Sequence, residues 1–249
     1  MNSVPNMTDD RRLPRTNAAA ARTYARIAGV LFVLSILVGG FGEAYVPSRL
    51  IVPGNATATA DNIRAFAWLF RLGFAAYLVE AMCDIALSLI FYVLLAPTQK
   101  DLSLLAALFG VLATALFAVA ELFYLAPTLI LGGAKYLKTF SPEQLDTLAM
   151  LSLRVFALGG GVFIAFYGIA WVIRGYLIAR SGYFPKVLGI LMALGGLGFM
   201  AQNYTLVLVP AYSSNLWLLP MFLGGVPLMV WLLVKGINVA NWEERATTW

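Results

Sequence analysis

Six long apolar runs follow one another along this chain, and they restrict its fold more than any other feature of the sequence. Several of them exceed 18 residues, about the length that an α-helix needs to cross a hydrocarbon core of ~30 Å. In lipid every backbone N–H and C=O must be paired inside the protein, and a helix pairs them within one segment. The sequence therefore predicts an all-α, polytopic transmembrane helical bundle with six spans, at 24–46, 68–96, 102–131, 147–174, 186–209 and 216–236.

The composition indicates a chain that lies almost wholly in the membrane. Of its 249 residues, 61% are hydrophobic and 12% are charged, whereas a soluble domain has about 25% charged residues. We expect one transmembrane domain over residues 23–238, with no room for a second soluble domain. The polar ends are then a disordered cytoplasmic tail over 1–22 and a cytoplasmic C-terminal tail over 239–249.

Arginine and lysine are distributed unevenly between the two sides of the predicted membrane. With the N-terminus inside, the outer segments hold only Arg49, Arg64, Lys135 and Lys138. Cytoplasmic segments of membrane proteins are enriched in these residues, so both termini are expected in the cytoplasm. The inner segments hold Arg11, Arg12, Arg15, Arg22, Arg26, Lys100, Arg174, Arg180, Lys186, Lys235 and Arg245.

The residue types that are missing narrow the chemistry. The net charge of +5 is spread over chain ends and loops, where topology places it, so it does not indicate a nucleic-acid partner. Histidine is absent, which excludes histidine-ligated zinc or haem and a histidine general base. Cys83 is the single cysteine, so no intrachain disulfide can form. No metal or cofactor is implied, and membrane lipids are the expected partners.

Two short motifs predict helix starts ahead of the membrane. "SPEQ" (Ser141 to Gln144) places an N-cap serine, a proline at the first helical position and a glutamine at the capping-box position. The fourth span should therefore enter the bilayer already helical. "TADNIRAF" (Thr59 to Phe66) predicts a similar start for the second span.

The stretch "YLVEAMCDIALSL" (Tyr77 to Leu89) keeps two carboxylates inside an apolar run. Glu80 and Asp84 are four residues apart and share one helix face, which Tyr77 and Ser88 extend. A carboxylate facing lipid costs at least ~2.5–3.5 kcal/mol. This polar stripe is therefore expected to face the bundle interior or a wet cavity.

Other polar residues in the predicted spans fall at similar depths when each helix rises about 1.5 Å per residue. Nearly all of them lie in the outer half of the bilayer or near its midplane. This bias favours an outward-facing polar cavity with three carboxylates at its floor and arginines higher up. The expected ligand-binding set is Tyr77, Glu80, Asp84, Glu121, Arg71, Arg154, Gln202 and Asn203, with Glu43 near the outer surface.

Four carboxylates facing two arginines cannot all be ionised cheaply in a low dielectric, so at least one is expected to hold a proton near neutral pH. Such a group can exchange protons or balance a cationic ligand. The alternative is a structural ion-pair network in which Arg154 pairs with Glu121 or Glu80.

Four stretches resemble a bacterial family of six-helix integral membrane proteins known only as a domain of unknown function. The resemblance implies a multi-pass protein of the bacterial inner membrane and covers roughly residues 20–235. It supplies no activity, cofactor or catalytic residue. The stretches are "SRLIVPGNATATADNI" (Ser48 to Ile63), "FRLGF" (Phe70 to Phe74), "CDIALSLIFYVLL" (Cys83 to Leu95) and "SGYFPKVLGILMALGGLG" (Ser181 to Gly198).

Three functions are compatible with the sequence. The first is binding or transport of a small cationic, amphipathic or proton-coupled ligand, for which a bundle of this size would call for a homo-oligomer. The second is an intramembrane enzyme that uses a protonated carboxyl as general acid on a lipid or isoprenoid. The third is a structural or assembly protein whose polar residues only fix the helix register. The catalytic residues of the second reading stay unassigned.

Overall fold

A computed structural model of the protein describes residues 18–212 and 214–247, and within these ranges it is helical without strands. Six of its helices are long and apolar enough to cross a membrane, as predicted from the sequence. The long helices are α1 (Ala18–Gly39), α4 (Ala67–Leu95), α5 (Lys100–Ile130), α6 (Pro142–Ser181), α7 (Lys186–Leu208) and α8 (Leu219–Val234). Shorter elements are α2 (Val46–Leu50), α3 (Ala56–Ala65), α9 (Val239–Thr247), the π-helical segment Gly40–Tyr45, and 3-10 turns at Lys135–Leu137, Pro210–Tyr212 and Asn215–Leu218.

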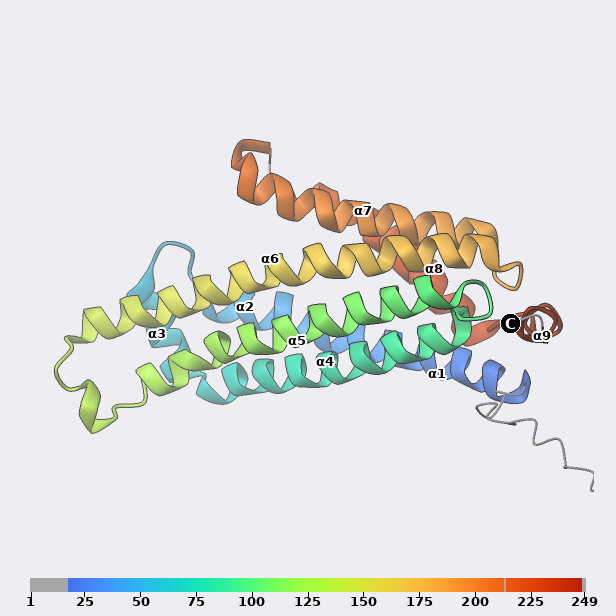
Figure 1. The fold of residues 1–249 in the computed structure, drawn as a ribbon. Coiled ribbons are helices and arrows are strands. Elements are labelled where there is room, and N and C mark those ends of the chain that lie inside the picture. The colour runs from blue at the N-terminus through green and yellow to red at the C-terminus, as the bar shows by residue number, and fades with distance from the viewer. Residues whose placement is uncertain (1–17, 213, 248–249) are drawn as a thin grey trace, which may run out of the picture.

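The long helices form a closed ring in which each packs against the next along the chain. α1 contacts α4, α4 contacts α5, and so on to α8, which returns to α1. α7 and α8 form a shorter hairpin that accompanies only part of α6 (Figure 1). The start of α1 and the helix α9 lie at one end of the bundle, and α3 lies at the other (Figure 1). These ends are called the α9 end and the α3 end below.

The first span is longer than predicted and changes its winding. α1 runs into the π-helical segment Gly40–Tyr45 and then into α2, so helical backbone continues to Leu50. The prediction that 59–66 leads directly into the second span was wrong. α3 is a separate helix, capped by Asn55, whose side chain accepts a hydrogen bond from the Ala58 N–H at 2.9 Å. Non-helical backbone at Phe66 (φ −119°, ψ 41°) separates it from α4.

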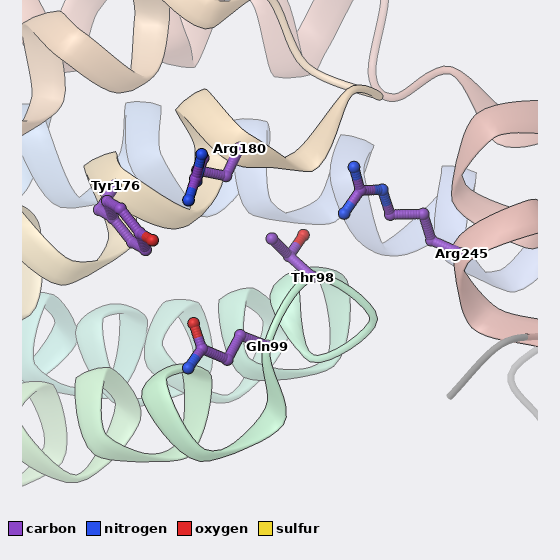
Figure 2. Close-up of a pocket in the computed structure, with 5 residues that line it drawn as sticks. All are labelled: Thr98, Gln99, Tyr176, Arg180 and Arg245. Atoms are coloured by element: carbon purple, nitrogen blue, oxygen red, sulfur yellow. The ribbon is translucent and has the colours of Figure 1, made fainter.

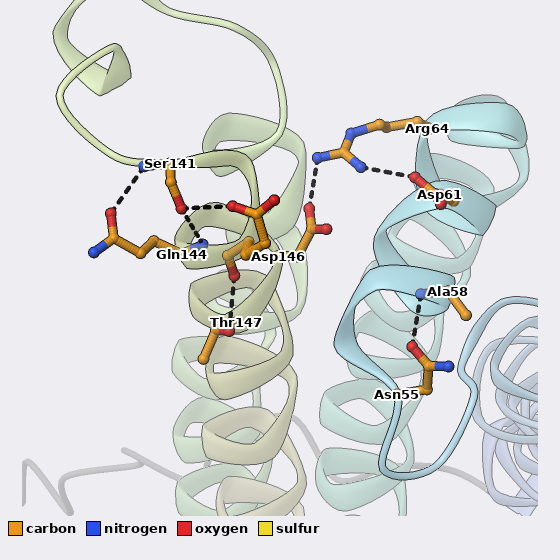
Figure 3. Close-up of polar contacts among 9 residues, drawn as sticks. Asn55, Ala58, Asp61, Arg64, Ser141, Gln144, Asp146 and Thr147 are labelled. Carbon is orange, nitrogen blue, oxygen red and sulfur yellow. Dashed lines mark hydrogen bonds and ion pairs between the residues drawn. The ribbon is translucent and has the colours of Figure 1, made fainter.

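Polar contacts fix α3 to the start of α6 (Figure 3). Arg64 donates to Asp146 at 2.6 Å and to Asp61 at 2.9 Å. Nearby, the predicted capping box is confirmed: Ser141 accepts from the Gln144 N–H, and the Gln144 side chain accepts from the Ser141 N–H at 2.8 Å. α6 therefore begins at Pro142, at the α3 end.

α6 also ends later than predicted, at Ser181 instead of residue 174. Gly182 stops it by adopting a left-handed conformation (φ 78°) that favours glycine. The consequence is that Arg174 lies inside the helix, about two turns from its end.

Both predicted tails contain helical residues. Residues 1–17 of the N-terminal tail lie outside the described residues, but α1 begins at Ala18, so the last residues of the predicted 1–22 tail are helical. The C-terminal segment forms α9, where Trp242 is 3% exposed and donates from Nε1 to the Leu94 carbonyl at 3.1 Å. This docking was not predicted from the sequence, because the anchor depends on a residue almost 150 positions away.

The core has two parts along the bundle axis. Toward the α9 end, Trp171, Phe199 and Leu228 belong to one buried cluster. Toward the α3 end, Tyr77 and Phe117 belong to a second. The polar residues described next lie mainly along α4, where these two clusters meet.

Candidate functional site

The polar stripe of α4 faces α1. Ser35 on α1 donates to Asp84 Oδ1 at 3.2 Å. One turn further toward the α3 end, Glu80 occupies the space that Gly39 leaves: a Cβ on Gly39 would lie 2.5 Å from Glu80 Oε1. Tyr77 donates to the Gly42 carbonyl at 2.9 Å. The helix spacing of the stripe therefore matches a row of small residues on the neighbouring helix.

The π-helical segment Gly40–Tyr45 brings a further carboxylate to this seam. It carries Glu43, which lies within electrostatic range of both Glu80 and Asp84. π-Helical turns inside α-helices are rare and frequently occur at functional sites. The sequence "GGFGE" (Gly39 to Glu43) was the signal for this close α1–α4 contact.

Helix α5 contributes a fourth carboxylate, that of Glu121. Its side chain is 0% exposed, and neither carboxyl oxygen has a hydrogen-bond partner among the described residues. It lies within electrostatic range of Glu80 and Tyr77. We call Glu43, Glu80, Asp84 and Glu121 the carboxylate cluster. In the described part of the chain, no ion pair joins a member of this cluster to a lysine or arginine.

Accessibility falls along the carboxylate cluster from its surface end to its core end. Glu43 is exposed and Glu80 is half-buried. Asp84 is 6% exposed and Glu121 0%. A proton or cation arriving at the bundle surface would therefore meet Glu43 first and the enclosed groups last.

A buried arginine lies beyond Asp84, and sequence reasoning missed it. Arg174 on α6 is 2% exposed and donates from Nη2 to Ser88 Oγ at 2.9 Å. Its guanidinium lies 5.5 Å from the Phe91 ring centroid and 5.8 Å from that of Tyr167. Asp84 lies within its electrostatic range. The assignment of Arg174 to an inner loop was wrong because α6 extends past it.

Three helices must approach closely to hold Arg174. On α5, a Cβ on Gly110 would meet Arg174 Nη2 and would lie 2.5 Å from Ser88 Oγ on α4. Glycine is therefore the residue that leaves room for this hydrogen bond. Tyr167 lies near both Arg174 and Asp84, so it links the arginine to the carboxylate cluster.

The remaining residues of the predicted set lie elsewhere. Arg71 on α4 and Arg154 on α6 are exposed on the bundle surface. Gln202 and Asn203 are half-buried on α7. A Cβ on Gly161 of α6 would lie 2.7 Å from Asn203 Oδ1, and Gln202 Oε1 has no hydrogen-bond partner among the described residues. The structure thus brings the predicted carboxylates and Tyr77 together and leaves the predicted arginines apart from them.

A pocket of about 310 Å³ lies at the α9 end, away from the carboxylate cluster (Figure 2). The carboxylate cluster is instead bordered by packed aromatic rings. Tyr77 packs edge-on against Phe117 (centroids 5.8 Å apart) and Phe156 (5.3 Å). In the described residues no group of acidic or cysteine side chains is arranged to hold a metal ion.

Comparison with known proteins identifies a family and supplies no activity. Residues 27–236 match the sequence profile of a family described as a domain of unknown function, DUF4386. An uncharacterized protein of Archaeoglobus fulgidus is 28% identical over 158 residues, which cover 64% of this chain and 80% of that protein. No solved structure matches the chain. The sequence similarity therefore extends to an archaeal protein.

Proposed function

This chain belongs to the DUF4386 family, a domain of unknown function, and we propose that it binds protons or a small cationic ligand at the carboxylate cluster inside its membrane-spanning bundle. The observation that carries the proposal is Glu121, fully buried with both oxygens unpartnered among the described residues. An ionised carboxylate left in this state costs several kcal/mol. Glu121 must therefore hold a proton or receive a cation.

The neighbours of Glu121 strengthen this argument. Glu80 is near it, and Glu80 is also near Glu43 and Asp84. Carboxylates that share a site cannot all ionise without a compensating positive charge. Among the described residues, Arg174 is the cation within electrostatic range of Asp84. One cation cannot balance four ionised carboxylates, so the cluster can accept further positive charge.

The decreasing accessibility from Glu43 to Asp84 supports stepwise entry. Asp84 follows Glu80 by one helical turn, so both occupy the same face of α4. A proton or an ammonium group could pass from one carboxylate to the next without crossing apolar surface. Proton-coupled transport would use such a row, with Tyr167 and Arg174 beyond it.

We further propose that the protein resides in the cytoplasmic membrane with both termini inside. The α9 end, where α1, α5 and α7 begin and α6 ends, carries Arg26, Lys100, Arg180, Lys186 and Arg245, as the positive-inside rule requires of a cytoplasmic face. A reporter that is active only in the cytoplasm should then be active when it is fused after α9.

Binding of the small cation methylammonium to detergent-purified protein tests the proposal. The wild type should bind it with an affinity that falls on acidification, because protons compete for the same carboxylates. Glu121→Gln and Asp84→Asn should each weaken binding at least about tenfold, since each removes a charge-assisted contact. Glu243→Gln, on α9, is the matched control. Unchanged affinity and pH dependence in both cluster variants would refute the proposal.

A purely structural role makes a different prediction. The contacts of Ser35 with Asp84 and of Gly39 with Glu80 fix the register of α1 on α4. If register is their only role, the variants should lose stability without altering cation binding or its pH dependence. The enzyme reading has less support, because the aromatic rings near Glu121 have their faces and edges occupied by one another, as in a packed core.

A further inference from the structure

The pocket at the α9 end is formed by three separate segments (Figure 2). The turn between α4 and α5 contributes Thr98 and Gln99, the last part of α6 contributes Tyr176 and Arg180, and α9 contributes Arg245. In Figure 2 the Arg245 side chain extends from α9 toward Thr98, and the Arg180 guanidinium lies on the Tyr176 side of the pocket. Its volume of about 310 Å³ is at the lower end of the range of small-molecule sites.

Hydrogen bonds below the pocket hold its walls in place. Tyr183 donates to the Leu94 carbonyl at 2.8 Å, and its hydroxyl lies 2.8 Å from Thr98 Oγ1. Burial raises the pKa of Tyr183 to about 12, so the phenol keeps its proton at physiological pH. Trp242 donates to the same Leu94 carbonyl at 3.1 Å, which fixes α9 and with it Arg245. The turn and α9, which form two of the pocket's walls, are therefore held in place.

The lining is positive and rich in donors. Arg180 and Arg245 contribute positive charges, and none of the five described residues that line the pocket is acidic. Gln99 is the N-cap residue of the 31-residue helix α5, whose N-terminus adds a partial positive charge. The acidic residues nearest to this lining along the chain are Glu244, which precedes Arg245, and Asp101 in the first turn of α5, and neither of them lines the pocket. The net field inside the pocket should attract an anion.

The geometry of arginine selects among anions. A guanidinium presents paired N–H donors that match the oxygens of a phosphate group, and arginine is preferred over lysine where bidentate contacts are made. Basic pockets between transmembrane helices commonly hold lipid head groups. Arg180 is oriented by its stacking on Tyr176, with 5.5 Å from the guanidinium carbon to the ring centroid.

We propose that this pocket binds a phosphate group, supplied either by the head group of an anionic phospholipid or by a small phosphorylated solute. The site is separate from the carboxylate cluster, which lies toward the middle of the bundle. Arg245 lies outside the region 27–236 that the family profile matches. The pocket is therefore completed by an element beyond the common family core.

Two probes distinguish the sources of phosphate. Native mass spectrometry of protein extracted from vesicles of phosphatidylglycerol and phosphatidylcholine measures lipid retention, and thermal stabilisation by inorganic phosphate measures binding of the free anion. If a lipid supplies the group, the wild type should retain phosphatidylglycerol selectively. If a solute supplies it, phosphate should stabilise the wild type and sulfonate buffer at equal ionic strength should not.

Substitutions connect either signal to the pocket. Arg180→Gln with Arg245→Gln should lower the retained lipid or the phosphate affinity at least about tenfold. Arg180→Lys should restore only part of it, because lysine keeps the charge but not the paired donors. Lys186→Gln removes one charge from the same end without lining the pocket and should leave binding unchanged. The proposal would be overturned if the double variant bound each probe as well as the wild type does. It would also be overturned if the wild type bound neither phosphatidylglycerol nor inorganic phosphate.

Discussion

Gly110→Ala tests whether α4, α5 and α6 meet at Arg174 as described. The new methyl group would meet Arg174 Nη2 and lie 2.5 Å from Ser88 Oγ. Both atoms end side chains, so they can move, but moving them breaks the 2.9 Å hydrogen bond that Arg174 donates to Ser88. A hydrogen bond to a charged group contributes about 1.5–3 kcal/mol. Alanine offsets roughly 1 kcal/mol of this through helix propensity.

The expected net loss is therefore about 0.5–2 kcal/mol, and the control should show no such loss. A Cβ on Gly160 would touch only Phe117, at an ordinary 3.7 Å, so Gly160→Ala should be neutral or stabilising. Equilibrium unfolding in mixed detergent micelles, followed by tryptophan fluorescence, measures both free energies of unfolding.

A double-mutant cycle separates the hydrogen bond from general crowding. If Gly110→Ala acts through the Arg174–Ser88 contact, its cost should shrink in a Ser88→Ala background. Additive effects of the two substitutions, or equal stability of Gly110→Ala and Gly160→Ala, would refute the reasoning.

Three further substitutions probe the packing around α6, α7 and α9. Gly189→Ala should lower the free energy of unfolding by about 1–3 kcal/mol, because the new Cβ would lie 2.5 Å from the Gly175 carbonyl oxygen and force α6 and α7 apart. A variant as stable as the wild type would contradict this. Trp242→Phe removes the donor to the Leu94 carbonyl, so limited proteolysis should cleave near α9 faster, and an unchanged rate would count against the docked helix. Tyr183 has its pKa raised to about 12 by burial, while an unfolded tyrosine titrates near 10. Its contribution to stability is therefore present below about pH 10 and lost toward pH 12; Tyr183→Phe should show a shallower loss over this window, and an identical slope would contradict the assignment.

Features fixed by neighbouring residues were predictable from the sequence. The six spans follow from continuous hydrophobic runs, and the structure contains six helices of the required length and composition. The start of α6 follows from a capping box contained in four consecutive residues. The common face of Glu80 and Asp84 follows from helical spacing alone, and it faces α1.

Features that depend on distant partners were not predictable in this way. The burial of Arg174 requires Ser88 and Gly110 on two other helices, and nothing near Arg174 in the sequence signals them. A charge near a span boundary is ordinarily a topology signal, so it was counted as one. The docking of α9 through Trp242 was unpredictable for the same reason, since the carbonyl that accepts its hydrogen bond belongs to α4. By contrast, Gly39 and Gly42 near Glu43 indicate close helix contact, which a hydropathy profile alone does not detect.

The protonation state of Glu121 tests the central claim most directly. Infrared spectroscopy of the protein in lipid resolves the C=O stretch of a protonated carboxyl from that of a carboxylate. The account predicts a protonated-carboxyl band at neutral pH that Glu121→Gln diminishes, that Glu243→Gln leaves unchanged, and that weakens when a cationic ligand is added. A spectrum at neutral pH in which that band is absent, or in which Glu121→Gln has no effect on it and cations do not alter it, would contradict a cluster that holds protons or cations.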